Sequence, residues 1–193
     1  MSNNKPDRRD FMINIGILVG SLRKESYNMK IAKYIMKNYS QKANFNLVDI
    51  KDFPLFNEDL EDNVPESVLK ARREIKEKDA IIIISPEYNH SIPGVIKNAL
   101  DWFSRDDYAM MKKPYLIMGA SSGTIGTTRM QSHIRQVLNS GAFQMYSMPY
   151  NEFLFARIQD NIDEEGNLIN EGTVKRLNKK IEDFIRFVKM ITQ

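Results

Sequence analysis

Short apolar runs alternate with amphipathic segments along the chain, and this alternation constrains the fold more than any other feature. The apolar runs occupy residues 12–19, 45–50, 80–85, 114–119 and 142–148. Such runs are typical of strands that are covered on both faces, as in a parallel sheet. The segments between them place apolar residues three and four positions apart, which is the spacing of an amphipathic helix. The pattern therefore predicts an α/β fold: a doubly wound sheet of five parallel strands with helices on both faces.

The same pattern predicts the extent of the fold but leaves the strand order open. Helices are predicted around residues 29–36, from about residue 65, around 95–104, up to about residue 139 and over 172–191. No repeat or low-complexity segment interrupts the alternation, so residues 11–193 are expected to form a single domain. Residues 1–10 are expected to be a flexible tail. Two strand orders are common in such sheets, and periodicity does not choose between them.

Composition excludes several classes of function. The 193 residues include no cysteine, so disulfides, thiolate metal sites and cysteine nucleophiles are excluded. A net charge of +3, from 28 basic and 25 acidic residues, is too small to indicate a nucleic-acid partner. No apolar run approaches the roughly 20 residues of a membrane helix, and no signal peptide is recognisable. His90 and His133 lack the spacing of a zinc site, so no metal is predicted. These features fit a cytoplasmic protein without membrane contact.

The predicted strand 12–19 is followed by a loop with the composition of an anion site. This first loop, residues 20–28, reads GSLRKESYN and leads into a predicted helix. The free N–H groups and partial positive charge of a helix N-terminus favour a bound anion, and Arg23 can hold a phosphate with two hydrogen bonds. The alternative is that Ser26 or Asn28 simply caps the helix.

Two further loops of unusual composition follow the predicted third and fourth strands, at the edge where open α/β sheets bind ligands. The second loop, residues 86–94, reads PEYNHSIPG, in which Tyr88 offers a flat face to an aromatic ring. The third loop, residues 121–129, reads SSGTIGTTR, and its glycines allow a ligand to approach the backbone closely. The alternatives are an ordinary surface turn for the second loop and a flexible connection for the third.

Three segments together resemble the NADPH-dependent FMN reductase family, which is flavodoxin-like in fold and includes quinone, azo-dye and chromate reductases. GSLRKESYN is similar to the family's phosphate loop, of the form GSxRxxSxN. PEYNHSIPGVIKNALDW is close to its most diagnostic segment, and GASSGTIGTTRMQSHIRQVL resembles its third loop and following helix. The resemblance implies the strand order 2-1-3-4-5 and an FMN cofactor at the three loops.

The resemblance also assigns cofactor contacts to individual residues. The residues implied at the FMN phosphate are Ser21, Arg23, Ser26, Tyr27 and Asn28. The residues implied at the isoalloxazine edge are Pro86, Glu87, Tyr88, Asn89 and Ser91. The residues implied at the flavin or ribityl side are Ser121, Gly123 and Gly126. Two positions depart from the family pattern. Glu25 stands where relatives often carry glycine and must point away from a phosphate, and Thr127-Thr128 replaces a glycine and a small residue in the third loop.

The function implied by the resemblance is hydride transfer. NADPH or NADH would reduce bound FMN, which would then reduce a small-molecule electron acceptor such as a quinone, an azo compound or free flavin. No protein acid, base or nucleophile is assigned. The alternatives are a flavodoxin-like electron-transfer or flavin-binding protein without NAD(P)H activity, and a regulatory protein that has lost the cofactor. The family also suggests a homodimer or homotetramer, for which the candidate interface residues are Trp102, Phe103, Met110 and Met111.

Overall fold

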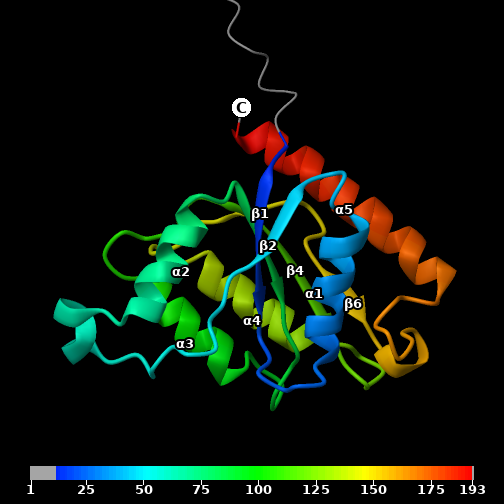
Figure 1. The fold of residues 1–193 in the computed structure, drawn as a ribbon, viewed down its shortest axis with the longest axis horizontal. Coiled ribbons are helices and arrows are strands. Elements are labelled where there is room, and N and C mark those ends of the chain that lie inside the picture. The colour runs from blue at the N-terminus through cyan, green and yellow to red at the C-terminus, as the bar shows by residue number, and fades with distance from the viewer. Residues whose placement is uncertain (1–11, 193) are drawn as a thin grey trace, which may run out of the picture.

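A parallel sheet with helices on both faces forms the centre of the molecule (Figure 1). The computed structural model describes residues 12–192, so the predicted tail 1–10 lies outside the described residues, as do Phe11 and Gln193. The sheet contains β1 (Asn14–Val19), β2 (Asn44–Leu47), β3 (Ala80–Ile84), β4 (Pro114–Ala120), β5 (Tyr146–Ser147) and β6 (Phe153–Phe155). The strands are parallel and follow the order β2-β1-β3-β4-β5, with β6 also paired to β4. The predicted doubly wound sheet and its order 2-1-3-4-5 are confirmed.

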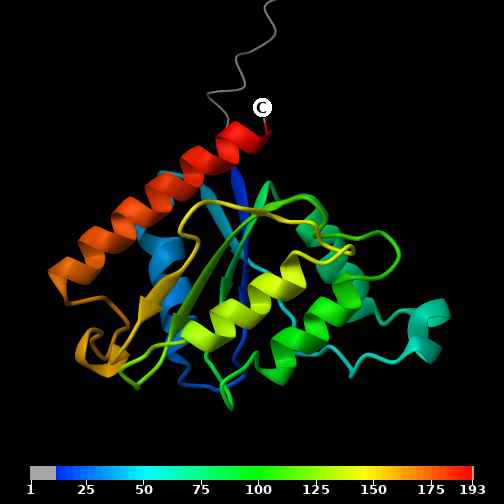
Figure 2. The same ribbon diagram turned by 180° about the vertical axis from the view of Figure 1, so that it is seen from behind.

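The helices form two layers, one on each face of the sheet (Figures 1 and 2). They are α1 (Tyr27–Asn38), α2 (Glu66–Lys76), α3 (Gly94–Phe103), α4 (Thr128–Leu138) and α5 (Glu171–Thr192), with short 3₁₀ turns at Glu58–Asn63 and Ile158–Asp160. Alternate residues of β3 face opposite layers: Ile82 and Ile84 pack with α1 and α5, whereas Ile81 and Ile83 pack with α2, α3 and α4. Burial on both faces explains why β3 is apolar throughout.

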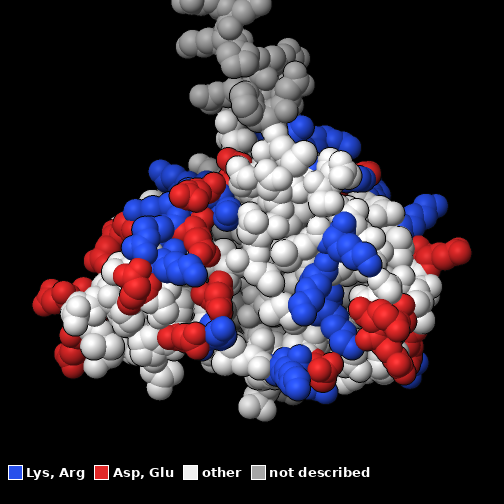
Figure 3. Space-filling view, viewed as in Figure 1, with Lys and Arg blue, Asp and Glu red and all other residues white. Residues whose placement is uncertain are grey.

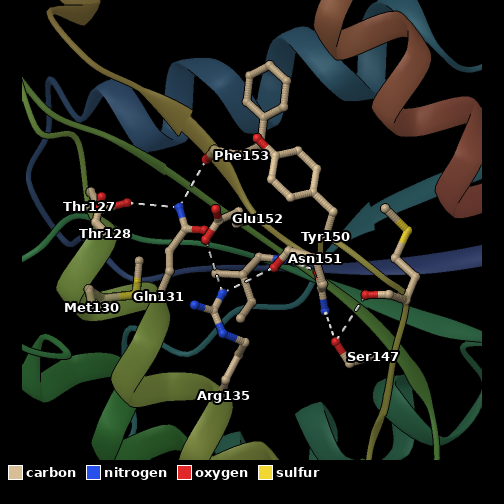
Figure 4. Close-up of polar contacts among 12 residues, drawn as sticks. Thr127, Thr128, Met130, Gln131, Arg135, Ser147, Tyr150, Asn151, Glu152 and Phe153 are labelled. Atoms are coloured by element: carbon tan, nitrogen blue, oxygen red, sulfur yellow. Dashed lines mark hydrogen bonds and ion pairs between the residues drawn. The ribbon is translucent and has the colours of Figure 1, made fainter.

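The last position of the sheet is filled by two short strands rather than by one. The prediction of a strand over 142–148 was too long, and β6 was not predicted. β5 pairs with the start of β4 and β6 with its end. Between them, the buried Asn151 side chain accepts a hydrogen bond from Ile117 N (3.1 Å) and donates one to Tyr115 O (2.9 Å), which replaces the backbone of the missing strand. The same amide also donates to Ser147 Oγ (3.1 Å) at the end of β5 (Figure 4). Tyr150, with a φ of 56°, turns the chain at this interruption.

Three of the four predicted interface residues lie in the core instead. Trp102, Phe103 and Met110 are each 0% exposed in the single chain, so the prediction that they form an interface was wrong. The indole N–H of Trp102 donates to Pro54 O (2.9 Å), and its ring meets Phe56 edge to face at 5.0 Å. Through these contacts the loop after β2 packs on α3 and covers Trp102, which explains why this side chain is buried. Across residues 12–192, no helix is long and apolar enough to cross a membrane.

Candidate functional site

Three loops meet at the carboxyl edge of the sheet, because β1, β3 and β4 are adjacent and parallel. Two glycines let the strand ends pack closely here. A Cβ on Gly20 would lie 2.6 Å from Ile96 Cγ1, and a Cβ on Gly119 would lie 2.5 Å from Ser85 O and overlap Thr127. The first, second and third loops therefore leave the sheet side by side, as the sequence predicted for strands in this order.

The first loop presents backbone donors at the N-terminus of α1. Ser26 is the N-cap and accepts a hydrogen bond from Met29 N (3.3 Å). Within the described chain, the backbone N–H groups of residues 24–28 have no recorded acceptor. The side chain of Glu25 is 66% exposed and lies 3.9 Å from Lys30 Nζ, so its carboxylate is drawn toward a lysine. Free N–H groups on a helix N-terminus, with Arg23 exposed beside them, form a site for an anion.

Asn28 occupies a different position from the other predicted phosphate residues. It is 3% exposed, its Oδ1 accepts from Ala120 N (2.9 Å), and its Nδ2 donates to Ala120 O (3.1 Å). Both polar ends of the amide are therefore engaged with the end of β4. Tyr27, the first residue of α1, packs half-buried against the core. Asn28 thus fixes the first loop relative to the third.

A tight turn shapes the second loop. Tyr88 and Ser91 exchange backbone hydrogen bonds (3.2 and 3.0 Å), and the two residues between them, Asn89 and His90, have φ values of 48° and 62°. Two left-handed residues between a bonded pair define a type I′ turn, which Asn accepts readily. Tyr88 is 52% exposed and Pro86 is half-buried before it. The turn therefore presents an aromatic ring at the edge of the site.

Glu87 holds the second loop against α4. Its carboxylate, 11% exposed, accepts a hydrogen bond from Met130 N (3.0 Å) at the helix N-terminus and lies 3.6 Å from both Arg129 Nη1 and His90 Nδ1. Burial raises the pKa of Glu87, but the backbone donors of Met130 and Arg129, with His90 and the Arg129 guanidinium, outweigh it and lower the pKa. The carboxylate is therefore directed into the protein.

Ser91 makes a second link from this loop to α4, because its Oγ lies 3.0 Å from His133 Nδ1. Arg129 Nη1 also lies 3.1 Å from His90 Nδ1. The sequence alone predicted no functional role for His90 or His133, and it did not identify Arg129 as a partner of the second loop. Their partners are about 40 residues away along the chain, so no local pattern could have identified them.

The third loop is held at both ends and open in the middle. Ser121 N donates to Phe155 O (3.1 Å), and Ser121 Oγ donates to Gly126 O (3.2 Å). Gly126 has a φ of +71°, which favours glycine, and a Cβ on Gly123 would meet nothing closer than 3.7 Å. Across the described chain, no acceptor is recorded for the backbone N–H groups of residues 122–125. These donors suit the oxygen atoms of a ligand that lies along the loop.

The combined geometry fits a ligand with a phosphate at one end and a flat polar ring at the other. The phosphate matches the free donors at the N-terminus of α1, and the ring matches Tyr88 with the open amides of the third loop. FMN has both parts. Among residues 12–192, no group of three or more His, Asp or Glu side chains is placed to bind a metal.

Comparison with known proteins gives the family. The profile of the family described as NADPH-dependent FMN reductase matches residues 13–160. The chain is 36% identical over 181 residues to the NADH:(hydroxy)cinnamate reductase subunit CrdA of Vibrio ruber, covering 94% of this chain and 90% of that one. It is 35% identical over 184 residues to the quinone reductase of Escherichia coli, covering 93% and 97%.

A solved structure agrees with these relatives. FerB, a flavoenzyme NAD(P)H:(acceptor) oxidoreductase from Paracoccus denitrificans, superposes with a TM-score of 0.82 at 34% identity, covering 93% of this chain and 98% of that one. The similarity extends over nearly the whole chain and favours the enzyme over the electron carrier that the sequence left open. The chain belongs to the NADPH-dependent FMN reductase family, and it is an NAD(P)H-dependent oxidoreductase with FMN as its cofactor.

Proposed function

We propose that FMN binds across the three loops and that the enzyme reduces quinone-type acceptors with NAD(P)H. The observation that carries this proposal is the set of free N–H groups at the N-terminus of α1, on the same edge as the exposed ring of Tyr88. The acceptor class follows the quinone reductase of E. coli, which is similar to this chain over nearly its whole length.

Each predicted site residue has a proposed role. Those proposed to contact the phosphate, with the N–H groups of residues 24–28, are Ser21, Arg23 and Ser26. Those proposed to line the ring are Pro86, Tyr88 and Asn89, and those proposed along the ribityl side are Ser121, Gly123 and Gly126. Those proposed to hold the loops in place are Tyr27, Asn28, Glu87 and Ser91.

The chemistry of this site divides between cofactor and protein. FMN supplies the hydride transfer when it is bound. The protein neutralises the phosphate with Arg23 and the positive end of α1, which costs no rearrangement because the donors are already in place. The rigid turn Tyr88–Ser91 fixes one wall of the ring site, and the half-exposed Tyr88 leaves room beside it for a flat acceptor. No side chain is assigned as acid, base or nucleophile.

The test is spectroscopic. Purified protein is expected to retain FMN, and anaerobic NADPH is expected to bleach the flavin band, which a quinone then restores. A bound flavin that NADPH leaves unbleached would contradict the reductase, and failure to bind FMN even after reconstitution would contradict the site.

Arg23→Ala tests the phosphate contact. Loss of a charge-assisted hydrogen bond is expected to weaken FMN binding by about 1–3 kcal/mol, or roughly 5- to 150-fold. Arg73→Ala is the matched control, because Arg73 is exposed on α2 and pairs with Glu66 away from the loops. Fluorescence titration of FMN into FMN-free protein gives both affinities, and equal values would remove Arg23 from the site.

We further propose a cytoplasmic homodimer or homotetramer, with a second copy covering the flavin edge. The second and third loops each carry one exposed apolar side chain there: Tyr88 (52%) and Ile125 (56%). An apolar rim of this kind is typical of an interaction surface. Sedimentation equilibrium is the test, and a monomer at micromolar concentration would contradict the assembly.

A further inference from the structure

A groove lies on the β2 side of the first loop, beyond the flavin site. Its volume is ≈ 370 Å³, within the range of small-molecule sites. Its lining comes from the ends of β1 and β2, the first loop and the start of α1, and includes no residue of the second or third loop. The groove is therefore separate from the proposed ring site and shares with the phosphate site only the segment 21–24.

The walls of the groove are mainly apolar and its rim is cationic. Leu22, Met29 and Leu47 are among the apolar lining residues, and Leu22 is 60% exposed. Figure 3 shows an uncharged band over β2, hollowed toward the lower edge, with basic residues over α1 on one side and mixed charges over α2 on the other. Apolar walls that open at a charged rim suit a flat aromatic group bearing an anion.

Arg23, Lys24 and Lys51 are the basic lining residues, and since Arg23 is proposed for the FMN phosphate, Lys24 and Lys51 supply the positive charge for a second ligand. In the described chain, neither Arg23 nor Lys24 has a recorded ion pair. Asp49 is the acidic lining residue, and Lys51 compensates it through its backbone N–H (3.0 Å) and its Nζ (3.3 Å). The rim therefore carries a net positive charge that matches a phosphate group.

The position of Asp49 adds a second feature. It lies two residues after the end of β2, and its exposed carboxylate is an acceptor that suits a ribose hydroxyl. The groove thus combines an apolar slot, a ribose acceptor and a phosphate-binding rim. Those are the three parts of an adenosine phosphate.

The reach from the flavin ring to this groove also suits a dinucleotide. Strands in a sheet are about 4.8 Å apart, so β2 lies roughly 10–14 Å from β3 and β4, whose loops form the proposed ring site. An extended dinucleotide with its nicotinamide over the flavin places its adenosine end at about this distance. In the direction of β2 the lining is both apolar and cationic.

We infer that this groove binds the adenosine phosphate end of the nicotinamide dinucleotide, with the adenine between Leu22 and Leu47 and a phosphate between Lys24 and Lys51. The inference rests on the proposed flavin site, from which the reductant extends. NADH and NADPH both carry an adenosine phosphate. ADP corresponds to that part of NADH and adenosine 2′,5′-bisphosphate to that part of NADPH, so the affinities of the two probes distinguish the two dinucleotides.

The experiment titrates ADP and adenosine 2′,5′-bisphosphate into the FMN-loaded enzyme by calorimetry. Lys51→Glu reverses the charge of an exposed side chain that is remote from the proposed flavin contacts. Lys37→Glu is the matched control, because it makes the same charge change in the last turn of α1, away from the groove. Lys51→Glu is expected to weaken the adenosine phosphates at least fivefold, and Lys37→Glu to leave them unchanged.

Steady-state kinetics gives a second reading of the same variant. Because the adenosine end does not react, Lys51→Glu is expected to raise the KM for the dinucleotide at an unchanged kcat, with an unchanged FMN content. Equal affinities in wild type and Lys51→Glu, or no binding of either probe at millimolar concentration, would overturn the assignment. Binding of the probes by protein that cannot hold FMN would support the groove and refute the flavin site.

Discussion

Replacement of Asn28 by alanine tests whether this residue positions the loops or contacts the cofactor. The Asn28 amide makes two hydrogen bonds to Ala120 of β4, at 2.9 and 3.1 Å, and both residues are nearly inaccessible, at 3% and 2% exposure. The alanine variant leaves the N–H and C=O of Ala120 without partners. Because these groups are buried, water cannot easily replace the amide.

The magnitude follows from the two groups left unpaired. Each buried polar group without a partner costs about 1–3 kcal/mol, and alanine regains roughly 0.5 kcal/mol from its higher helix propensity. The expected loss in the free energy of unfolding is therefore about 1.5–5.5 kcal/mol. Asn38→Ala, in which an exposed amide on the same helix loses its bond to Tyr34 O, is expected to stay within about 0.5 kcal/mol.

Urea denaturation of the FMN-free protein, followed by circular dichroism, measures this difference without any contribution from the cofactor. A loss below about 1 kcal/mol would refute the structural role of Asn28. Full stability together with weakened FMN binding would instead support the direct phosphate contact that the family resemblance implied.

Three further outcomes are expected. The pKa of Glu87 is lower in the folded protein than its ordinary value of 4.5. Its contribution to stability is therefore present above about pH 4.5 and is lost as the pH falls through the pKa of the folded state. Glu87→Gln should make the free energy of unfolding less dependent on pH on the acid side. Gly119→Ala should cost about 1–3 kcal/mol, because its Cβ overlaps Thr127, whereas Gly94→Ala meets nothing within 4 Å and should be near neutral in thermal melts. Burial raises the pKa of Tyr39, which donates to Asn178 Oδ1 (2.6 Å), so stability should fall as the pH rises above 10, and Tyr39→Phe should remove that fall in alkaline denaturation.

The central sheet was predictable because burial on both faces leaves a direct signal in the sequence. β3 is apolar at every position, and each of its residues is 0% exposed. The strand order could not come from periodicity and was implied by resemblance. The end of the sheet was not predictable at all, because Asn151 completes the pairing of β4 with a side chain, and an isolated polar residue between two short strands gives no strand signal.

The loops at the carboxyl edge show what local sequence can and cannot predict. The free backbone donors of the first loop were predictable, because they belong to a helix N-terminus and the loop between strand and helix is visible in the sequence. The capping alternative for Ser26 and the phosphate role are compatible, since the cap uses the side chain and leaves the N–H groups of residues 24–28 free.

Side-chain roles were less predictable, because polar residues of one loop find partners on distant elements. Asn28 engages Ala120, and Glu87 engages the start of α4, 92 and 43 residues away respectively. The family resemblance implied cofactor contacts at both positions. In the structure each of them also forms a link between neighbouring elements, so that the first loop is tied to the end of β4 and the second loop to α4. A flavin site on separate loops requires such links, because the backbone donors can match a rigid ring only if the loops keep their relative positions.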